Sequence, residues 1–458
     1  MLFTILLSAM NLFAQITLRG KVINFNDKSP LPGASIYFPD LKTGTSTNSD
    51  GSYQIKNLPK GKFSISVKYI GYNSINQTVL LEQDLMQDFE LLEGVVESKE
   101  FIVTGVSQAT ERSRMPVPVS LVSKSVLLQN SASNIVEAIS KQAGISQLST
   151  GQGISKPIIR GLGYNRVVIV HDGIRQEGQQ WGDEHGLELD DFSVNSVEIL
   201  KGPASLSFGS DAMAGVVNFI SAPSASNGEI KGELLGNYQS NNSLQGYSAY
   251  LSGNQNGFVW DARYSRKMAG NYQNKYDGKV YNSGFNENNL KGMLGLNRKW
   301  GYSHIIFSQY EMKVALPEGE RDSLSGKFTR EKVLSDSSTI TEIVPAKDLL
   351  GYGLDIPQQS ITHLKLVWDN NFVFNSSRIS ARLGYQENNR KEFGDINNVD
   401  LANLYFQLRT ATADIRYHFP EKQGRTISFG ISSMLQNSRN KGIEYLVPEY
   451  ELADVGAF

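Results

Sequence analysis

The second half of the chain consists largely of long segments in which apolar and polar residues alternate. Residues 228–239 read GEIKGELLGNYQ, and every second position there is apolar or glycine: Ile230, Gly232, Leu234, Gly236 and Tyr238. Because successive side chains of a β-strand point to opposite faces, this period predicts strands with one apolar and one polar face. The same alternation recurs at residues 257–267, 378–386, 411–419 and 426–434. The pattern therefore predicts β-sheet throughout residues 228–458.

These alternating segments have the features of strands that cross a lipid bilayer. They are about ten residues long and carry tyrosine or phenylalanine near their ends, as is typical of membrane strands with aromatic residues at the interfaces. A strand between lipid and a wet interior needs one apolar and one charged face. A soluble β-sandwich also alternates, and it is the alternative interpretation.

Residues 228–458 are too few to close a barrel around a whole domain. They supply about nine to eleven strands of the usual spanning length, whereas transporters with a plugged barrel use about 22 strands. Open sheet edges in lipid would leave backbone groups without hydrogen bonds. We therefore expect the N-terminal part of a longer barrel, with the charged segment 316–357 as an extracellular loop.

Composition and the first residues narrow the functional class. The 458 residues carry a formal net charge of −2, so nothing suggests a nucleic-acid partner, and the absence of cysteine excludes disulfides and thiolate chemistry. Residues 1–14 hold an apolar block and are predicted to be a signal peptide, with a buried first element as the alternative. No later apolar run reaches the length of about 20 residues that a membrane-spanning helix needs.

Residues 16–92 alternate over shorter stretches. ITLRGKVIN, PGASIYF, GSYQIKNL and KFSISVKYIGY are strand-like, and they are separated by turn sequences such as Asp50-Gly51 and Pro59-Lys60-Gly61. Short strands separated by such turn sequences predict a small β-sandwich. The segment resembles the carboxypeptidase-regulatory-like module that precedes the plug domain in outer-membrane receptors of the Bacteroidetes type.

Residues 112–222 mix strand and helix patterns and contain two glycine-rich strings. The strings read PIIRGLGYNRVVIVHDGIR from position 157 and SVEILKGPASLSFGSDAMAGVVNFISA from position 196. Each is a short apolar strand that ends in a break where glycine allows a tight turn. The strings resemble the plug domain of TonB-dependent outer-membrane receptors, and the resemblance extends over nearly the whole chain. The motif residues that it implies are Arg160, Gly161, Asp172, Gly173, Glu198, Lys201, Gly202, Pro203, Gly209, Gly215 and Asn218.

The same region contains one helical pattern. Residues 132–143 place apolar side chains at helical spacing: Ile135, Val136, Ile139 and Ala143. Ser131 or Ser133 is predicted to cap this helix, and Gly144 is predicted to end it.

Residues 93–111 form a polar bridge between these two domains. The bridge contains the short β-prone run Phe101, Ile102, Val103, Thr104 and Gly105. The run resembles the TonB box, an extended peptide that the periplasmic energising protein captures by adding it as a strand to a sheet edge. An edge strand of a neighbouring domain is the alternative interpretation.

Residues 176–191 form an acidic loop, QEGQQWGDEHGLELDD, that contains one of the five histidines. Carboxylates beside an imidazole suit a divalent ion such as zinc, so the loop is a candidate metal or cargo contact. A solvated acidic turn is the alternative. His171, at the end of an apolar strand, is expected to be a hydrogen-bonded interior histidine. The candidate contact residues are Trp181, Asp183, Glu184, His185 and Glu188.

The resemblance implies a multi-domain, mainly β protein with a small β-sandwich at 16–92, a linker with the TonB box at 93–111, an α+β plug domain at 112–222 and a partial antiparallel transmembrane β-barrel at 228–458. It implies TonB-dependent import of a scarce ligand (a metal, a metal–siderophore complex, haem or a cobalamin) across the cell outer membrane. The expected partners are the TonB energising complex, outer-membrane lipid and the small-molecule or metal-complex cargo. No cofactor is expected.

Two other functions fit parts of the sequence. A glycan importer that works with a surface lipoprotein shares the N-terminal module and the TonB box. A zinc carboxypeptidase-related protein would use the H-x-x-E pair of His185 and Glu188. A catalytic zinc needs a third protein ligand and an open position, and the chain has no room for such a catalytic domain. We therefore expect a protein that is not an enzyme.

Overall fold

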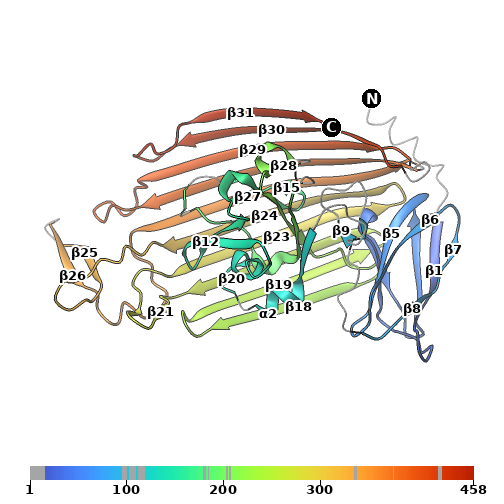
Figure 1. Ribbon diagram of the computed structural model, residues 1–458, viewed down its shortest axis with the longest axis horizontal. Coiled ribbons are helices and arrows are strands. Elements are labelled where there is room, and N and C mark those ends of the chain that lie inside the picture. The colour runs from blue at the N-terminus through green and yellow to red at the C-terminus, as the bar shows by residue number, and fades with distance from the viewer. Residues whose placement is uncertain are drawn as a thin grey trace.

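The computed structural model describes residues 16–94, 101–102, 110–111, 119–130, 132–178, 182–183, 185–202, 205, 208–334, 338–374, 376–420 and 425–458. The expected signal peptide therefore lies outside the described residues, as does most of the bridge at 93–111. The described chain forms three parts, which we call the N-terminal sandwich (16–94), the central domain (119–222) and the strand wall (230–457) (Figure 1). No helix in these described ranges is long and apolar enough to cross a membrane.

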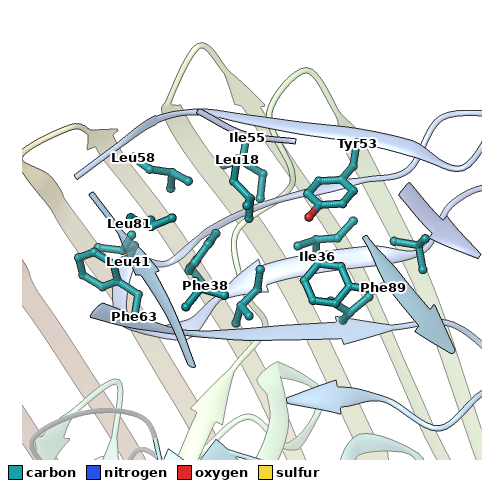
Figure 2. Close-up of a cluster of buried hydrophobic side chains, with 14 of the residues drawn as sticks. Leu18, Ile36, Phe38, Leu41, Tyr53, Ile55, Leu58, Phe63, Leu81 and Phe89 are labelled. Carbon is teal, nitrogen blue, oxygen red and sulfur yellow. The ribbon is translucent and has the colours of Figure 1, made fainter. Parts of the chain in front are cut away.

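The N-terminal sandwich consists of two small sheets packed face to face. The first sheet joins β4 (Ser52–Leu58), β1 (Ile16–Asn24), β7 (Leu85–Met86) and β8 (Phe89–Leu91), and the second has the order β3 (Thr43–Ser46), β2 (Ser35–Phe38), β5 (Gly61–Lys68) and β6 (Ile75–Leu81). Figure 2 shows side chains of the two sheets meeting in one core, in which Leu18, Ile36 and Phe38 are fully buried. The predicted β-sandwich is confirmed.

The central domain is built on one mixed sheet. Its strand order is β11 (Val119–Ser123), β16 (Val194–Leu200), β17 (Gly215–Ser221), β14 (Val167–His171) and β15 (Ile174–Arg175). Only β14 and β17 run parallel, and the other neighbours are antiparallel. A separate hairpin and the short helices complete the domain: β12 (Ile145–Gly151), β13 (Ile154–Ile159), α2 (Lys124–Gln129), α3 (Ile135–Ile139), and the 3-10 turns η3 (Tyr164–Arg166), η4 (Asp191–Ser193) and η6 (Ser210–Ala212).

Helix α3 is shorter than predicted, and its cap is a different residue. Asn134 caps it, because the Asn134 side chain accepts a hydrogen bond from the backbone N–H of Glu137. Glu137 in turn accepts from the backbone N–H of Ser133, so two unpaired donors at the helix start are satisfied together. The prediction of a serine cap was therefore wrong. Gly144 lies beyond the helix with a φ of +77°, a conformation that favours glycine.

The strand wall is a single antiparallel sheet of ten strands in which each strand pairs with the next along the chain. The strands are β18 (Ile230–Gln239), β19 (Leu244–Gln255), β20 (Phe258–Ala269), β23 (Phe285–Arg298), β24 (Gly301–Ala315), β27 (Gln358–Phe374), β28 (Ser377–Phe393), β29 (Leu404–His418), β30 (Ser428–Asn440) and β31 (Tyr450–Ala457). The predicted alternation is confirmed: Leu234 and Tyr238 are 84% and 67% exposed on one face, whereas Arg263 and Ser265 are buried on the other.

The two ends of the wall differ. Short turns such as Asn256-Gly257 connect the strands at the end where the N-terminal sandwich lies, which we call the sandwich end. Long connections lie at the opposite, loop end (Figure 1). The charged segment 316–357 is one of these connections. The loop end carries two small hairpins, formed by β21 (Gln273–Asn274) with β22 (Gly278–Lys279) and by β25 (Thr329–Val333) with β26 (Thr339–Ile343).

Candidate functional site

The glycine-rich strings form tight turns at the edges of the central domain. Asp172 and Gly173 are the two central residues of the β14–β15 hairpin, with φ values of +54° and +81°. Two positive φ values in a two-residue hairpin loop define the turn type for which Asp-Gly is a preferred sequence. Arg160 and Gly161 repeat this arrangement, with φ values of +49° and +84°, between the bridged residues 159 and 162.

The second string places its motif residues in and after two neighbouring strands. Glu198 on β16 and Asn218 on β17 lie opposite each other in the register, and both are buried. Lys201 follows β16 and donates to the carbonyl oxygen of Ala143 at 2.5 Å. Burial lowers the pKa of Lys201, and the nearby Arg160 acts in the same direction. Pro203 lies outside the described residues.

The remaining glycines of this string also have positive φ values: Gly202 (+92°), Gly209 (+93°) and Gly215 (+148°). At Gly215 a side chain is excluded by contact as well, because a Cβ atom would lie 2.3 Å from the carbonyl oxygen of Leu200.

The Asp172 turn points at two lysines of the strand wall. Lys291 on β23 donates to both carboxylate oxygens of Asp172 at 2.8 and 2.7 Å. Lys365 on β27 lies 3.8 Å from the same carboxylate and 2.7 Å from Nδ1 of His171. Burial acts to raise the pKa of Asp172, but the surrounding cations hold it well below its ordinary value. Asp172 is therefore a buried carboxylate held ionised by the wall.

His171 beside it is the interior histidine that the sequence predicts. Burial lowers the pKa of His171 well below its ordinary value; Asp172 opposes this shift, whereas Lys365 and Lys291 add to it. The imidazole is therefore neutral.

Contacts of the same kind continue toward the loop end. Lys365 donates to Gln176, whose amide nitrogen lies 3.1 Å from Nδ1 of His363. The same His363 nitrogen lies 2.7 Å from Oε2 of Glu188, and Arg390 donates to the other oxygen of Glu188 at 2.6 Å. Asn388 also donates to Glu188. Glu188 is thus bound by three side chains of the wall.

The contact nearest the loop end joins His185 to the wall. Nε2 of His185 lies 3.0 Å from Oε1 of Glu392, near the loop end of β28. Gln359 donates to Glu392 and accepts from Arg390, which connects this pair to Glu188. Burial lowers the pKa of His185 despite the opposing hydrogen bond to Glu392. We call this chain of contacts the ionic ladder: His185, Glu392, Gln359, Arg390, Glu188, His363, Gln176, Lys365, His171, Asp172 and Lys291.

Other contacts fasten the central domain to β20 and to the residues just before β23. Asp190 accepts from Ser265 at 2.8 Å, and Asp191 pairs with Lys267. Burial raises the pKa of Asp190, although Lys267 opposes the shift. At the tip of the β12–β13 hairpin, Gln152 donates to the carbonyl oxygen of Ser283 at 3.0 Å. The acidic loop and this hairpin therefore hold the domain against the polar face of the wall.

The structure distributes the candidate contact residues of the acidic loop among different partners. His185 and Glu188 bind different wall side chains, and Asp183 accepts from the Tyr164 hydroxyl. Within the described part of the chain, no group of three or more histidine, aspartate or glutamate side chains lies in an arrangement able to hold a metal ion. Trp181 and Glu184 lie outside the described residues.

Sequence reasoning missed the wall partners of the ladder. Lys291, Lys365 and Arg390 are charged residues on the polar face of alternating strands. Their position on that face indicates from the sequence that they point away from the apolar side. It does not identify the residues of the central domain that they bind.

Comparisons with known proteins agree with this architecture. Residues 18–103 match the family model of the CarboxypepD_reg-like domain, and residues 111–216 match that of the TonB-dependent Receptor Plug Domain. An iron-regulated outer membrane virulence protein of Vibrio cholerae is 31% identical over 127 residues, which are 26% of this chain and 19% of that protein. TonB-dependent receptor P39 of Formosa agariphila is 28% identical over 216 residues, which are 45% of this chain and 20% of that protein.

Solved receptor structures share the fold. The FrpB iron transporter from Neisseria meningitidis (F3-3 variant) superposes with a TM-score of 0.53 at 15% identity, over 70% of this chain and 49% of that one. The chain thus spans about half the length of this solved receptor. The central domain has the place of the plug, and the ten-stranded wall matches part of the receptor barrel. The chain therefore carries a CarboxypepD_reg-like domain followed by the plug domain of the TonB-dependent receptors, and it is similar to members of that family.

Proposed function

We propose that this chain works in active import across the outer membrane, with the strand wall in the bilayer and the central domain in the passage. The ionic ladder is the observation that carries the proposal. It gives the acidic loop, near the loop end, a continuous set of buried contacts to the Asp172 turn at the middle of the wall. A ligand that shifts the loop therefore alters the contacts that hold the domain in place.

The outer face of the wall supports the membrane placement. Leu234, Leu294 and Leu435 are among the large apolar side chains exposed on this face. Extensive apolar surface is unfavourable in water and suits the hydrocarbon region of a bilayer.

We propose residues 101–105 as the segment through which the TonB energising complex acts. The described part, β9 (Phe101–Ile102), pairs with β10 (Thr110–Glu111), so these two residues of the segment have the extended form that strand addition requires. Coupling to the inner-membrane proton gradient supplies about 2.3 kcal/mol per charge per 100 mV.

We propose a metal, a metal–siderophore complex, haem or a cobalamin as the cargo class. The names of the Vibrio cholerae and Neisseria meningitidis proteins refer to iron, which favours this class over a glycan. The residues proposed to touch the cargo are those of the acidic loop: Trp181, Asp183, Glu184, His185 and Glu188. Of the described members, His185 contacts Glu392 near the loop end of β28, where the long connections lie.

Substitutions at Ile102 test the coupling proposal. Ile102→Pro removes a backbone donor and blocks strand addition, whereas Ile102→Val keeps a residue that favours strands. We expect cells with Ile102→Pro to lose uptake of radiolabelled haem, ferric citrate and cobalamin, while cells with Ile102→Val keep it. Binding to cells whose proton gradient has been collapsed should be equal in the two variants. Uptake by the proline variant at the rate of the valine variant would refute the role of this segment.

A further inference from the structure

A chamber of about 1160 Å³ lies where the three parts of the molecule meet. It is bounded by the N-terminal sandwich, the underside of the central domain and the polar face of the wall. A volume of this size holds a drug-sized ligand. The charged lining residues around the contact described next are Asp40, Lys42, Asp369, Arg378, Arg382, Asp414 and Arg416.

Three of the wall arginines that line this chamber come from two neighbouring strands. Arg378 and Arg382 lie on the same face of β28, four positions apart, and Arg416 on β29 pairs in register with Ser380, midway between them. Two of these arginines have a carboxylate of the wall as partner. Arg382 donates to Asp369 at 3.2 Å, and Arg416 binds both oxygens of Asp414 at 2.7 and 3.0 Å.

Arg378 differs from the other two, because its carboxylate partner comes from another domain. Nη1 of Arg378 donates to Oδ1 of Asp40, in the N-terminal sandwich, at 3.2 Å. Arg378 is only 9% exposed, and its Nε has no hydrogen-bond partner within the described ranges. A guanidinium has five N–H donors in a planar fork that matches a carboxylate or phosphate. This buried group therefore has donors to spare.

Asp40 reaches Arg378 on a short segment that makes several of the contacts between the sandwich and the wall. The segment is the 3-10 turn η1 (Pro39–Leu41) together with Lys42. Asn371 donates to the carbonyl oxygen of Asp40 at 2.8 Å, and Asn297 to that of Lys42 at 2.6 Å. Lys42 pairs with Asp369 at 2.6 Å. Asp40 of the N-terminal sandwich thus binds Arg378, which is the one of these three arginines that has no carboxylate partner on the wall.

The charges around this contact favour an anion. Lys42, Arg378, Arg382 and Arg416 face Asp40, Asp369 and Asp414, which is four cations against three carboxylates. Without the sandwich, three arginines face two carboxylates. The site therefore keeps one positive charge in excess whether or not the sandwich is docked, and an excess of one sign attracts ligands of the other.

We infer that Arg378 is an oxyanion-binding group of the chamber, held in this structure by Asp40, and that a carboxylate or phosphate of the cargo displaces Asp40 and loosens the docked sandwich. This inference rests on the proposed function, because it treats the chamber as part of the cargo's path. It names a feature of the cargo, an anionic oxygen group, and gives the N-terminal sandwich a role as a closure that the cargo itself releases.

Calorimetric titration of the purified full chain in detergent tests the inference, with inorganic phosphate and citrate as probes. We expect Asp40→Asn to bind at least one probe several-fold more tightly than the unaltered chain, because the competing carboxylate is gone. Arg378→Gln should weaken binding at least tenfold. Arg409→Gln is the matched control, because Arg409 lies on β29 but pairs with Glu387 in an exposed contact. The probe that binds assigns the anion as phosphate or carboxylate.

Several results would overturn the inference: no heat with either probe in the unaltered chain and in Asp40→Asn, unchanged affinity in a folded Arg378→Gln, or weaker binding in Asp40→Asn. If Arg378→Gln fails to fold, the Asp40→Asn comparison decides alone. The titration needs neither TonB nor uptake. Anion binding with no transport would therefore refute the proposed function and leave Arg378 as an anion site, whereas transport without anion binding would refute only the inference.

Discussion

Arg390 on the strand wall donates from Nη2 to Oε1 of Glu188 in the central domain at 2.6 Å, across 202 positions of sequence. Both residues are buried, and Arg390 has no exposed surface. Two charges removed from water are best tolerated when they are paired and further hydrogen bonds satisfy most of their remaining groups. Here His363 binds the second oxygen of Glu188 and Gln359 accepts from Nη1 of Arg390, while the buried Nε of Arg390 has no hydrogen-bond partner among the described residues. The pair ties the acidic loop to the wall more specifically than an apolar contact of the same size.

Removal of one member of this pair should be costly. Arg390→Gln leaves Glu188 as a buried charge without its main partner, and we expect a loss of about 3–5 kcal/mol of unfolding free energy. Lys332→Gln breaks the exposed Lys332–Glu342 pair of the β25–β26 hairpin and should cost about 0–1 kcal/mol. Denaturant unfolding in detergent, followed by tryptophan fluorescence, measures both. Equal losses in the two variants would contradict the assignment of a buried, paired charge.

Stability should fall on mild acidification because His171 stays neutral in the folded protein. The pKa of His171 is lowered by burial, whereas an unfolded histidine takes up a proton below about pH 6.5. The unfolded state then binds more protons, so the unfolding free energy decreases as the pH falls below that value. His185 contributes with the same sign. The contribution of Asp172 is complete above about pH 3.9 and is lost only as the pH falls through its depressed folded value.

His171→Gln isolates this effect. We expect its unfolding free energy to decline less steeply than that of the unaltered chain between pH 6.5 and 5, by up to about 1.4 kcal/mol per pH unit. The difference between the two proteins at pH 7.5, where the unfolded histidine is also neutral, gives the packing contribution separately. Parallel slopes would show that His171 is protonated in the folded state.

Two glycines of the second string provide a matched comparison of backbone strain. Gly202→Ala and Gly215→Ala both force a side chain into a positive φ, at a cost of about 1–2 kcal/mol. Only Gly215→Ala adds a collision, because its Cβ would lie 2.3 Å from the Leu200 carbonyl, whereas nothing lies within 4 Å at Gly202. Thermal unfolding should therefore rank Gly215→Ala clearly below Gly202→Ala. The reverse order would mean that β16 and β17 separate easily.

A charge on the outer face of the wall tests the membrane placement. Leu290 lies at the middle of β23 on the exposed face, and Leu290→Arg should destabilise a lipid-embedded wall by about 2–4 kcal/mol. Leu324→Arg, in the exposed connection at the loop end, should have almost no effect. The measurement is folding into lipid vesicles monitored by protease protection. A wall that tolerates both arginines equally does not face lipid.

Short-range patterns predicted the secondary structure well. Alternation over ten residues identifies the strands and both of their faces, because side-chain direction in a strand depends only on the parity of the position. Asp172-Gly173 likewise predicts its own turn from local backbone preferences. Helix α2, six residues long, escaped detection because one and a half turns display no period.

The partners within the site were not predictable in the same way. Glu188 looked like a metal ligand because its neighbours in sequence are His185 and other carboxylates. Its actual partners, His363, Asn388 and Arg390, are 175 to 202 positions away. Only the folding of the central domain against the wall brings these residues together. The periodicity of the loop sequence carries no information about that contact.

The position of β11 at the margin of the central sheet decides how that domain responds to tension. This strand has a single hydrogen-bonded neighbour, β16, and Val119 at its start lies beside Leu200. A pulling force applied from the N-terminal side acts first on the hydrogen bonds between β11 and β16, before any hydrogen bond among β16, β17 and β14 carries force. The hydrogen bonds of β11 can thus break one after another, so the domain can lose its outermost strand while the other four strands of the sheet stay in place.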